Sequence, residues 1–591
     1  MRRIRVDLTV ALLLLAAHTL AIWGYTGVFW GDIGRWSHEV ERFALGELPY
    51  RDFQWHYPPF GLWLEGGAAR LLGTDLAQLS TITTTLAALL VVTFVYYSRD
   101  VLDRADAVVV AICVVLAFSY AQTVGAPLPM GLYSPAALVG ALCIANTARL
   151  FLKGLATNSS RDAEWMALFA ALAVLSKQDF WIPAAFLVGA STWRSRRLGP
   201  AVVSATVTAV GVALIVWTAG AHMLLPLAGG FGHAKLAGGQ GFPSWERLTV
   251  DMFALALVSG VFLLLATLVC GKRFLRPMVA AGVVAMLMGG LHIVASMNTV
   301  LPPADGLSNP TQNALAYQLK AGTSLLRPAI GWLRERVSRT PIPVSLPPLL
   351  LLFTALRWGK LPHPRRTTVA LLLGLAIAFR ARRAFEGTEW FEFLLTLPIV
   401  LASVELLLGL PDVQWRRLRT ATYGTLAVLA VWAYAALGRG VGTGRHYPAA
   451  TTLRGTVHWK PTEVQDYQRL LATLDAIDPA RARPLWAFGF SGGFNYFLRR
   501  RNAFPFTQDF FFSAFNADSV LRQRPPGLFL LDHHVLEDGS FGVAGFNWRS
   551  WEQGRVAAPY APYDRPRFDR LRAGCPAVAM DSTMFQLYAC P

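Results

Sequence analysis

Apolar runs of about 15 to 22 residues recur along the first three quarters of this chain and constrain its fold more than any other feature. A helix needs roughly 17 to 25 such residues to cross a bilayer. Of the 591 residues, 54% are hydrophobic and 15% are charged, whereas soluble proteins carry roughly a quarter charged residues. The sequence therefore predicts a mainly α-helical, polytopic integral membrane protein.

Apolar windows predict about 13 transmembrane helices within a membrane domain that spans residues 1–440. The amino-terminal apolar run resembles a secretory signal, but no clear cleavage site follows it, so we expect an uncleaved first span. The predicted spans lie near 8–27, 77–97, 107–123, 131–152, 163–177, 180–194, 200–220, 249–270, 277–297, 344–358, 366–380, 391–409 and 417–438.

Basic residues predict the orientation of the chain. Arg2, Arg3 and Arg5 place the amino terminus in the cytoplasm, and alternate loops carry further basic clusters. These clusters share one side only if residues 59–72 do not cross, so we expect a helix lying in the membrane interface there. The first extracytoplasmic loop is then about 28–76. Cytoplasmic loops and anionic lipids explain the net charge of +18 better than nucleic acid does.

The last region, residues 441–591, has a different composition and contains no predicted span. Short apolar runs at 484–490, 527–532 and 583–590 predict strands, and the spacing within 462–477 predicts a helix. We expect an extracytoplasmic α/β domain. Cys575 and Cys590 would be able to pair in an oxidising compartment, and the sequence leaves their state open.

Residues 30–60 carry the most specific pattern in the chain. Asp32 follows an apolar segment, a Gly-x-x-Pro-Tyr-x-Asp turn occupies 46–52, and Tyr57 begins a Tyr-Pro-Pro sequence. This loop resembles the first extracytoplasmic loop of the GT-C superfamily, polytopic glycosyltransferases that usually take sugars from polyprenyl-phosphate lipids. The layout of residues 1–440 and the outer tail resemble its lipid-A aminoarabinose transferase and protein mannosyltransferase branches.

The resemblance implies that Asp32 faces the acceptor and acts as the general base. The alternative is that Asp32 only caps a helix running from about Gly34 to Leu45. Asp52 and Tyr57 would support the loop, and Asp52 would help to order its turn. We expect Glu39 and Glu41 to line a solvated face of the helix.

The sequence LSKQDFW at 175–181 is a second candidate, because it lies between two predicted spans on the outer side. Many GT-C enzymes carry a similar lysine after an apolar helix of small residues. The resemblance implies that Lys177 binds the donor phosphate, with Gln178 or Asp179 ordering it. The alternative is that Lys177 merely extends its side chain toward the membrane surface.

Arginines at 380–383 form a third candidate. Planar guanidinium groups suit bidentate binding of phosphate, so we expect Arg380 or Arg383 to contact the donor phosphate. The alternatives are an Arg–Glu network with Glu386 and Glu389, or contact with anionic lipid head groups.

No cofactor is expected with certainty, and a divalent cation is not favoured. His38 and His56 lie near Asp32 in sequence, but the paired acids of clearly metal-dependent GT-C enzymes are missing. We expect a glycosyltransferase of a bacterial inner membrane that uses a polyprenyl-phosphate sugar and a glycan, glycolipid or protein acceptor. The rival interpretations are a glycolipid transporter or flippase, and an O-antigen ligase or acyltransferase.

Overall fold

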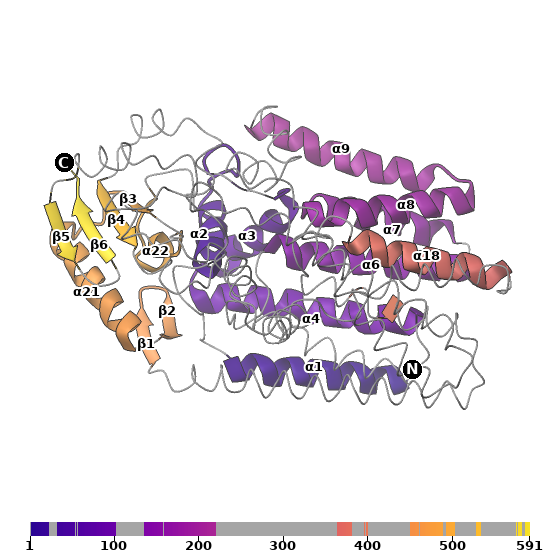
Figure 1. The fold of residues 1–591 in the computed structure, drawn as a ribbon, viewed down its shortest axis with the longest axis horizontal. Coiled ribbons are helices and arrows are strands. Elements are labelled where there is room, and N and C mark those ends of the chain that lie inside the picture. The colour runs from indigo at the N-terminus through magenta and orange to yellow at the C-terminus, as the bar shows by residue number, and fades with distance from the viewer. Residues whose placement is uncertain are drawn as a thin grey trace, which may run out of the picture.

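The computed structural model of the chain is dominated by helices (Figure 1). It describes residues 2–22, 32–53, 55, 57–101, 135–157, 159–219, 363–380, 395, 398–399, 449–459, 461–488, 492–502, 527–532, 575, 577–581 and 585–590.

Long helices run side by side through most of the molecule in Figure 1. Three stretches of the described residues are long and apolar enough to cross a membrane: Leu76–Asp100, Ala136–Gly154 and Gly199–Thr218. The predicted spans 107–123, 249–270, 277–297, 344–358 and 417–438, and nearly all of 391–409, lie outside the described residues, so the total of about 13 stays a prediction. The long helices are α1 (Arg2–Ile22), α4 (Leu76–Val101), α6 (Pro135–Thr157), α7 (Ser160–Val174), α8 (Trp181–Ser195), α9 (Gly199–Ala219) and α18 (His363–Arg380).

The first loop contributes two further helices, α2 (Asp32–Ala44) and α3 (Phe60–Leu72). Their bounds agree closely with those of the helix predicted from about Gly34 to Leu45 and of the helix predicted at 59–72. In Figure 1 they lie between the long helices and the strands, and α2 packs on α3 while α3 packs on α6. The first loop therefore connects the helical bundle to the tail.

The tail contains helices and short strands near the positions predicted from its apolar runs. β1 (Ala449–Thr452) and β2 (Gly455–His458) form an antiparallel hairpin, followed by α21 (Pro461–Ile477). A second sheet has the order β3-β4-β6-β5, in which β3 and β4 are parallel and the other pairs are antiparallel. Its strands are β3 (Leu485–Phe488), β4 (Leu528–Asp532), β5 (Ala577–Asp581) and β6 (Phe585–Ala589), and α22 (Gly492–Phe497) follows β3.

Cys575 and Cys590 form a disulfide, which answers the question that the sequence left open. Both residues are buried; Cys575 lies shortly before β5 and Cys590 directly after β6. The cross-link ties the segment before β5 to the end of β6 and thus closes the antiparallel pair that these strands form.

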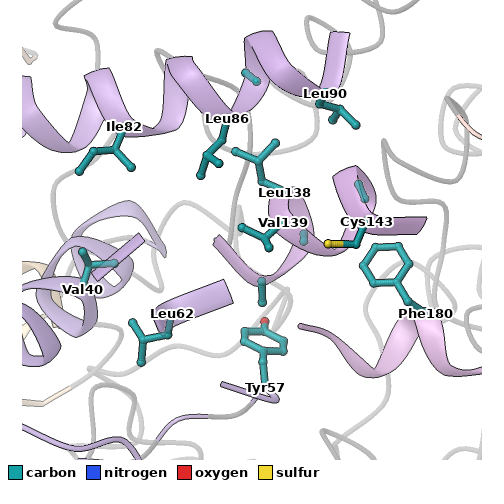
Figure 2. Packing of buried hydrophobic residues seen from close by; sticks show 14 of the residues in the cluster. Val40, Tyr57, Leu62, Ile82, Leu86, Leu90, Leu138, Val139, Cys143 and Phe180 are labelled. Atoms are coloured by element: carbon teal, nitrogen blue, oxygen red, sulfur yellow. The ribbon is translucent and has the colours of Figure 1, made fainter. Parts of the chain in front are cut away.

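The core of the bundle consists of small and branched apolar side chains on facing helices. Figure 2 shows Ile82, Leu86 and Leu90 of α4 pointing toward α6, where Leu138 and Val139 meet them. Figure 2 also shows Phe180 beside Cys143 and Tyr57 below Val139. Lipid tails are as apolar as these side chains, so close van der Waals packing between the helices, rather than removal from water, stabilises the bundle in a membrane.

Candidate functional site

The structure brings Lys177, Asp179 and Tyr57 together. Lys177 Nζ lies 2.9 Å from Oδ2 of Asp179 and 5.6 Å from the centre of the Tyr57 ring, within the range of a cation–π contact. All three residues are at most 4% exposed. A buried charge is costly unless it is paired, and Asp179 supplies the pairing that allows this lysine to lie in the protein interior.

The turn between α7 and α8 places Lys177 in the interior. α7 ends at Val174, and residues 178–180 form a single 3₁₀ turn, η2 (Gln178–Phe180), before α8 begins at Trp181. The Ser176 hydroxyl donates to Leu172 O and the Trp181 indole donates to Val174 O, which satisfies carbonyls at the end of α7. α7 therefore ends three residues earlier than the predicted span 163–177, and Lys177 lies in the turn itself.

Tyr57 reaches this turn because the first loop is joined to it. Phe60 N donates to Leu175 O across 2.9 Å, and the Trp55 indole donates to Pro58 O. The Tyr50 hydroxyl donates to Tyr57 O, so the start of the loop turn also fixes the position of Tyr57. The turn at Lys177 consequently lies at the same end of the bundle as α2 and α3.

Gln178 is also buried, at 3% exposure, and belongs to the same 3₁₀ turn as Asp179. The two residues that were expected to order Lys177 are thus neighbours within one short turn. The ion pair joins Lys177 to Asp179, and the contact of Gln178 with the lysine stays a prediction.

Asp52 organises the first loop. Its carboxylate accepts a hydrogen bond from Leu48 N and pairs with Arg51, while its carbonyl accepts from Arg42. The hydrogen bond from Arg51 lowers the pKa of Asp52, so the carboxylate stays ionised near neutral pH. These contacts close the turn between Leu48 and Asp52, and the part that Asp52 plays in a functional site stays a prediction.

Asp32 is the first residue of α2, and its side chain lies outside the described part of the structure. Its predicted role as a base therefore stays a prediction. The expectation that Glu39 and Glu41 face solvent is wrong. Glu39 is 1% exposed and lies 3.8 Å from Arg35, whereas Glu41 is 7% exposed and pairs with Arg454 of the tail. A helix that looks amphipathic in sequence is covered on its polar side as well.

Glu65 of α3 is a buried acid that the sequence analysis did not select. It is 1% exposed and accepts a hydrogen bond of 3.0 Å from the Trp36 indole of α2, while Oε1 has no hydrogen-bond partner among the described residues. Burial raises its pKa to about 8, although the Trp36 hydrogen bond acts in the opposite direction. The sequence signal that could have identified Glu65 is the presence of an acid within the otherwise apolar sequence GLWLEGG.

The arginine candidates are only partly described. Arg380 is the last residue of α18, but its side chain is not described, and Arg383, Glu386 and Glu389 lie outside the described residues. Their contact with a donor phosphate stays a prediction. Within the part of the chain that the structure describes, no three His, Cys, Asp or Glu residues are grouped as metal ligands. His56 lies outside that part, so the expectation about a metal also stays untested.

Comparisons with known proteins find similarity in structure only. No known protein family and no curated protein matches the chain in sequence.

The solved structures similar to this chain include ArnT from Cupriavidus metallidurans bound to undecaprenyl phosphate, with 15% identity and a TM-score of 0.42. That match covers 99% of this chain and 97% of ArnT. Another is the Archaeoglobus fulgidus oligosaccharyltransferase tethered with an acceptor peptide, with 14% identity, a TM-score of 0.44, and coverage of 88% and 69%. Both are GT-C membrane glycosyltransferases, the superfamily that the first loop resembles. At these TM-scores the likeness carries no argument about function, which rests on the chain's own residues.

Proposed function

We propose that the chain is a membrane glycosyltransferase that transfers a sugar from a polyprenyl-phosphate donor to an extracytoplasmic acceptor. The observation that carries this proposal is the buried Lys177, paired with Asp179 and covered by Tyr57 of the first loop. The Lys177 ammonium and the Asp32 carboxylate of the first loop would together provide the two charged groups that the reaction needs. A leaving phosphate requires a cation, and an attacking hydroxyl requires a base.

In the proposed reaction, Asp32 takes the proton of the acceptor hydroxyl. The acceptor oxygen then bonds to the anomeric carbon from the face opposite the phosphate, and the bond between that carbon and the phosphate oxygen breaks. Lys177 stabilises the charge on the departing polyprenyl phosphate, with Arg380 and Arg383 as further donors. The configuration at the anomeric carbon is inverted, and a divalent cation is not favoured.

Asp179 would neutralise Lys177 when no donor is bound. A lysine buried without a counter-ion would be strongly disfavoured, so a nearby carboxylate keeps the site charged and ready. The donor phosphate would then replace or share this contact. Asp179 is accordingly assigned to ordering Lys177, as expected from the sequence.

The proposed function also implies how the chain is placed in the cell. The amino terminus would be cytoplasmic and the tail extracytoplasmic, in a bacterial inner membrane. The Cys575–Cys590 disulfide supports this orientation, because such bonds persist in oxidising compartments. The acceptor would be a glycan, glycolipid or protein of the cell envelope.

The rival is a glycolipid transporter or flippase. Transporters tend to carry ionisable residues near the middle of their spans. In α4 the charged residues Arg99 and Asp100 lie in the last turn, and α9 has none. These two helices therefore favour the enzyme. An O-antigen ligase-like enzyme would also use outer cations, and the test below separates it by the lipid that accumulates.

The test compares a gene deletion with strains restored by wild type, Asp32→Asn or Asp162→Asn at equal membrane abundance. Asp162 is a matched acid in the first turn of α7 and pairs with Lys153, away from the first loop. Mass spectrometry of envelope glycans and polyprenyl lipids is the measurement. We expect Asp32→Asn to behave like the deletion, with one sugar missing and its monophosphate-linked lipid accumulating, while Asp162→Asn restores the sugar.

Restoration by Asp32→Asn would remove Asp32 as the base. Accumulation of a diphosphate-linked glycan in the deletion would favour the ligase. A deletion that changes neither glycans nor donor lipids would favour the transporter.

A further inference from the structure

Helix α2 is buried on every side although its sequence is polar. Between Gly34 and Arg42 every residue is buried except Trp36, which is half-buried. Such a helix would ordinarily be solvent-exposed, because buried charges are stable only when they are paired. Its buried charged and titratable residues are Arg35, His38, Glu39, Glu41 and Arg42.

Two other elements enclose α2. On one side the Trp36 indole donates to Glu65 of α3, and Phe43 fills the space above Gly66 so closely that a Cβ there would lie 2.4 Å from its ring. On the other side α22 of the tail packs along the helix. The position of α2 therefore depends on the tail as much as on the bundle, as its place between them in Figure 1 illustrates.

Arg454 makes the ionic part of this contact. It lies in the turn between β1 and β2 and is 7% exposed. Its guanidinium donates to Glu41 of α2 and lies 3.4 Å from Asp75 at the start of α4. Burial lowers the pKa of Arg454 to about 10, which leaves it charged at neutral pH.

The backbone around Arg454 strengthens the same junction. Leu76 N donates to Arg454 O across 3.0 Å, and Arg454 Nε donates to Tyr496 O of α22 across 2.9 Å. The Tyr496 hydroxyl in turn donates to Thr74 O. One tail arginine thus connects α2, the first residues of α4, and α22.

We propose that Arg454 is a positioning residue: through Glu41 it fixes α2, and thereby the place of Asp32 relative to Lys177. This inference rests on the proposed function and deepens it, because it makes the tail a structural part of the reaction centre. Asp32 and Glu41 belong to one helix of 13 residues, so a displacement at one end moves the other as a rigid body. A misplacement of about 1 Å in a reacting group can cost about 100-fold in rate.

The experiment uses three variants, Arg454→Gln, Glu41→Gln and the double variant that carries both changes. Each is compared with the control variant Arg481→Gln. Arg481 is a matched control, since it pairs with Asp475 elsewhere in the tail. Three quantities are measured on the full chain: hydrogen exchange of the α2 amides, binding of undecaprenyl phosphate to the purified protein, and sugar transfer in restored deletion strains at equal membrane abundance.

We expect faster exchange in α2 and about 100-fold less transfer for Arg454→Gln, with the Kd for undecaprenyl phosphate within about twofold of wild type. Glu41→Gln should act in the same direction, and the double variant should lose no more than the larger single loss, because both changes remove one contact. Arg481→Gln should match wild type in all three measurements.

Unchanged exchange and transfer in Arg454→Gln would overturn the inference. So would a parallel loss of binding and transfer, which indicates a general structural role. If Arg454→Gln is not recovered from membranes, wild-type transfer by Glu41→Gln overturns it instead. If the wild type transfers no sugar but α2 exchanges faster in Arg454→Gln, the contact between Arg454 and α2 stands and the proposed function is refuted.

Discussion

At the residue scale, Lys177 and Lys153 show how differently one side chain can be used. Lys153 is 47% exposed and pairs with Asp162 at the start of α7, where solvent screens the pair. Lys177 forms an ion pair of nearly the same length, 2.9 Å, but its side chain is 3% exposed. Because little solvent screens the buried pair, its charges influence a bound ligand more strongly than those of the exposed pair do.

Lys177→Gln should weaken binding of undecaprenyl phosphate by about 10- to 100-fold, because one charge-assisted hydrogen bond to the phosphate is lost. Binding to the purified protein in lipid nanodiscs is the measurement. Lys153→Gln is the control and should bind as wild type does. Equal affinities for the two variants would assign Lys177 to packing alone.

Glu65→Gln should flatten the pH dependence of stability. The pKa of Glu65 rises from 4.5 to about 8 on folding, so the folded state keeps its proton where the unfolded chain has lost it. The wild type should therefore lose stability as pH rises from about 5 to about 8, whereas the uncharged amide should not. Thermal unfolding of both proteins across this range is the measurement, and identical pH slopes would show that Glu65 is ionised in the folded protein.

At the element scale, the turn at Lys177 depends on a close approach between α6 and η2. Phe180 lies against Gly140 of α6, and a Cβ at Gly140 would lie 2.2 Å from its ring. Phe180 follows Asp179 directly, so the packing of its ring fixes the turn that carries Asp179, the partner of Lys177. Figure 2 shows the ring beside Cys143, one helical turn further along α6.

Gly140→Ala should destabilise the protein by about 1 to 3 kcal/mol, because the ring must move out of a close-packed site. Gly154→Ala on the same helix is the control, since nothing lies within 4 Å of its Cβ position. It should be neutral or stabilising by up to about 1 kcal/mol. Unfolding midpoints measured in one detergent compare the two, and equal midpoints would contradict the packing argument.

The sequence predicted elements better than it predicted their surroundings. Apolar runs placed β3, β4 and β6 and the helix α21, because strand and helix periodicity is local. The alternation of basic loops predicted an interfacial helix at 59–72; α3 occupies Phe60–Leu72, and its place in the membrane interface stays a prediction. The surroundings of Glu41 did not follow, because its partner Arg454 is 413 residues away and no local pattern encodes that contact. For the same reason the motif around Lys177 was visible, but its contact with Tyr57 was not.

At the scale of the whole molecule, the disulfide reports on which side of the membrane the tail lies. The chain has five cysteines: Cys575 and Cys590 are bridged, Cys143 is a free thiol, and Cys113 and Cys270 lie outside the described residues. Denatured protein should bind three maleimides before reduction and five after it, as measured by intact mass. Five before reduction, in protein extracted under alkylating conditions, would place the tail in a reducing compartment.

The burial of α2 also has a consequence for how the chain is made. Glu41 leaves the ribosome 413 residues before Arg454, an interval of about 20 to 80 s at synthesis rates of roughly 5 to 20 residues per second. During that interval the charged helix has been synthesised but the tail that covers it has not. A chain interrupted before the β1–β2 turn would keep α2 uncovered, and quality-control proteases would have an early and specific mark of an incomplete protein.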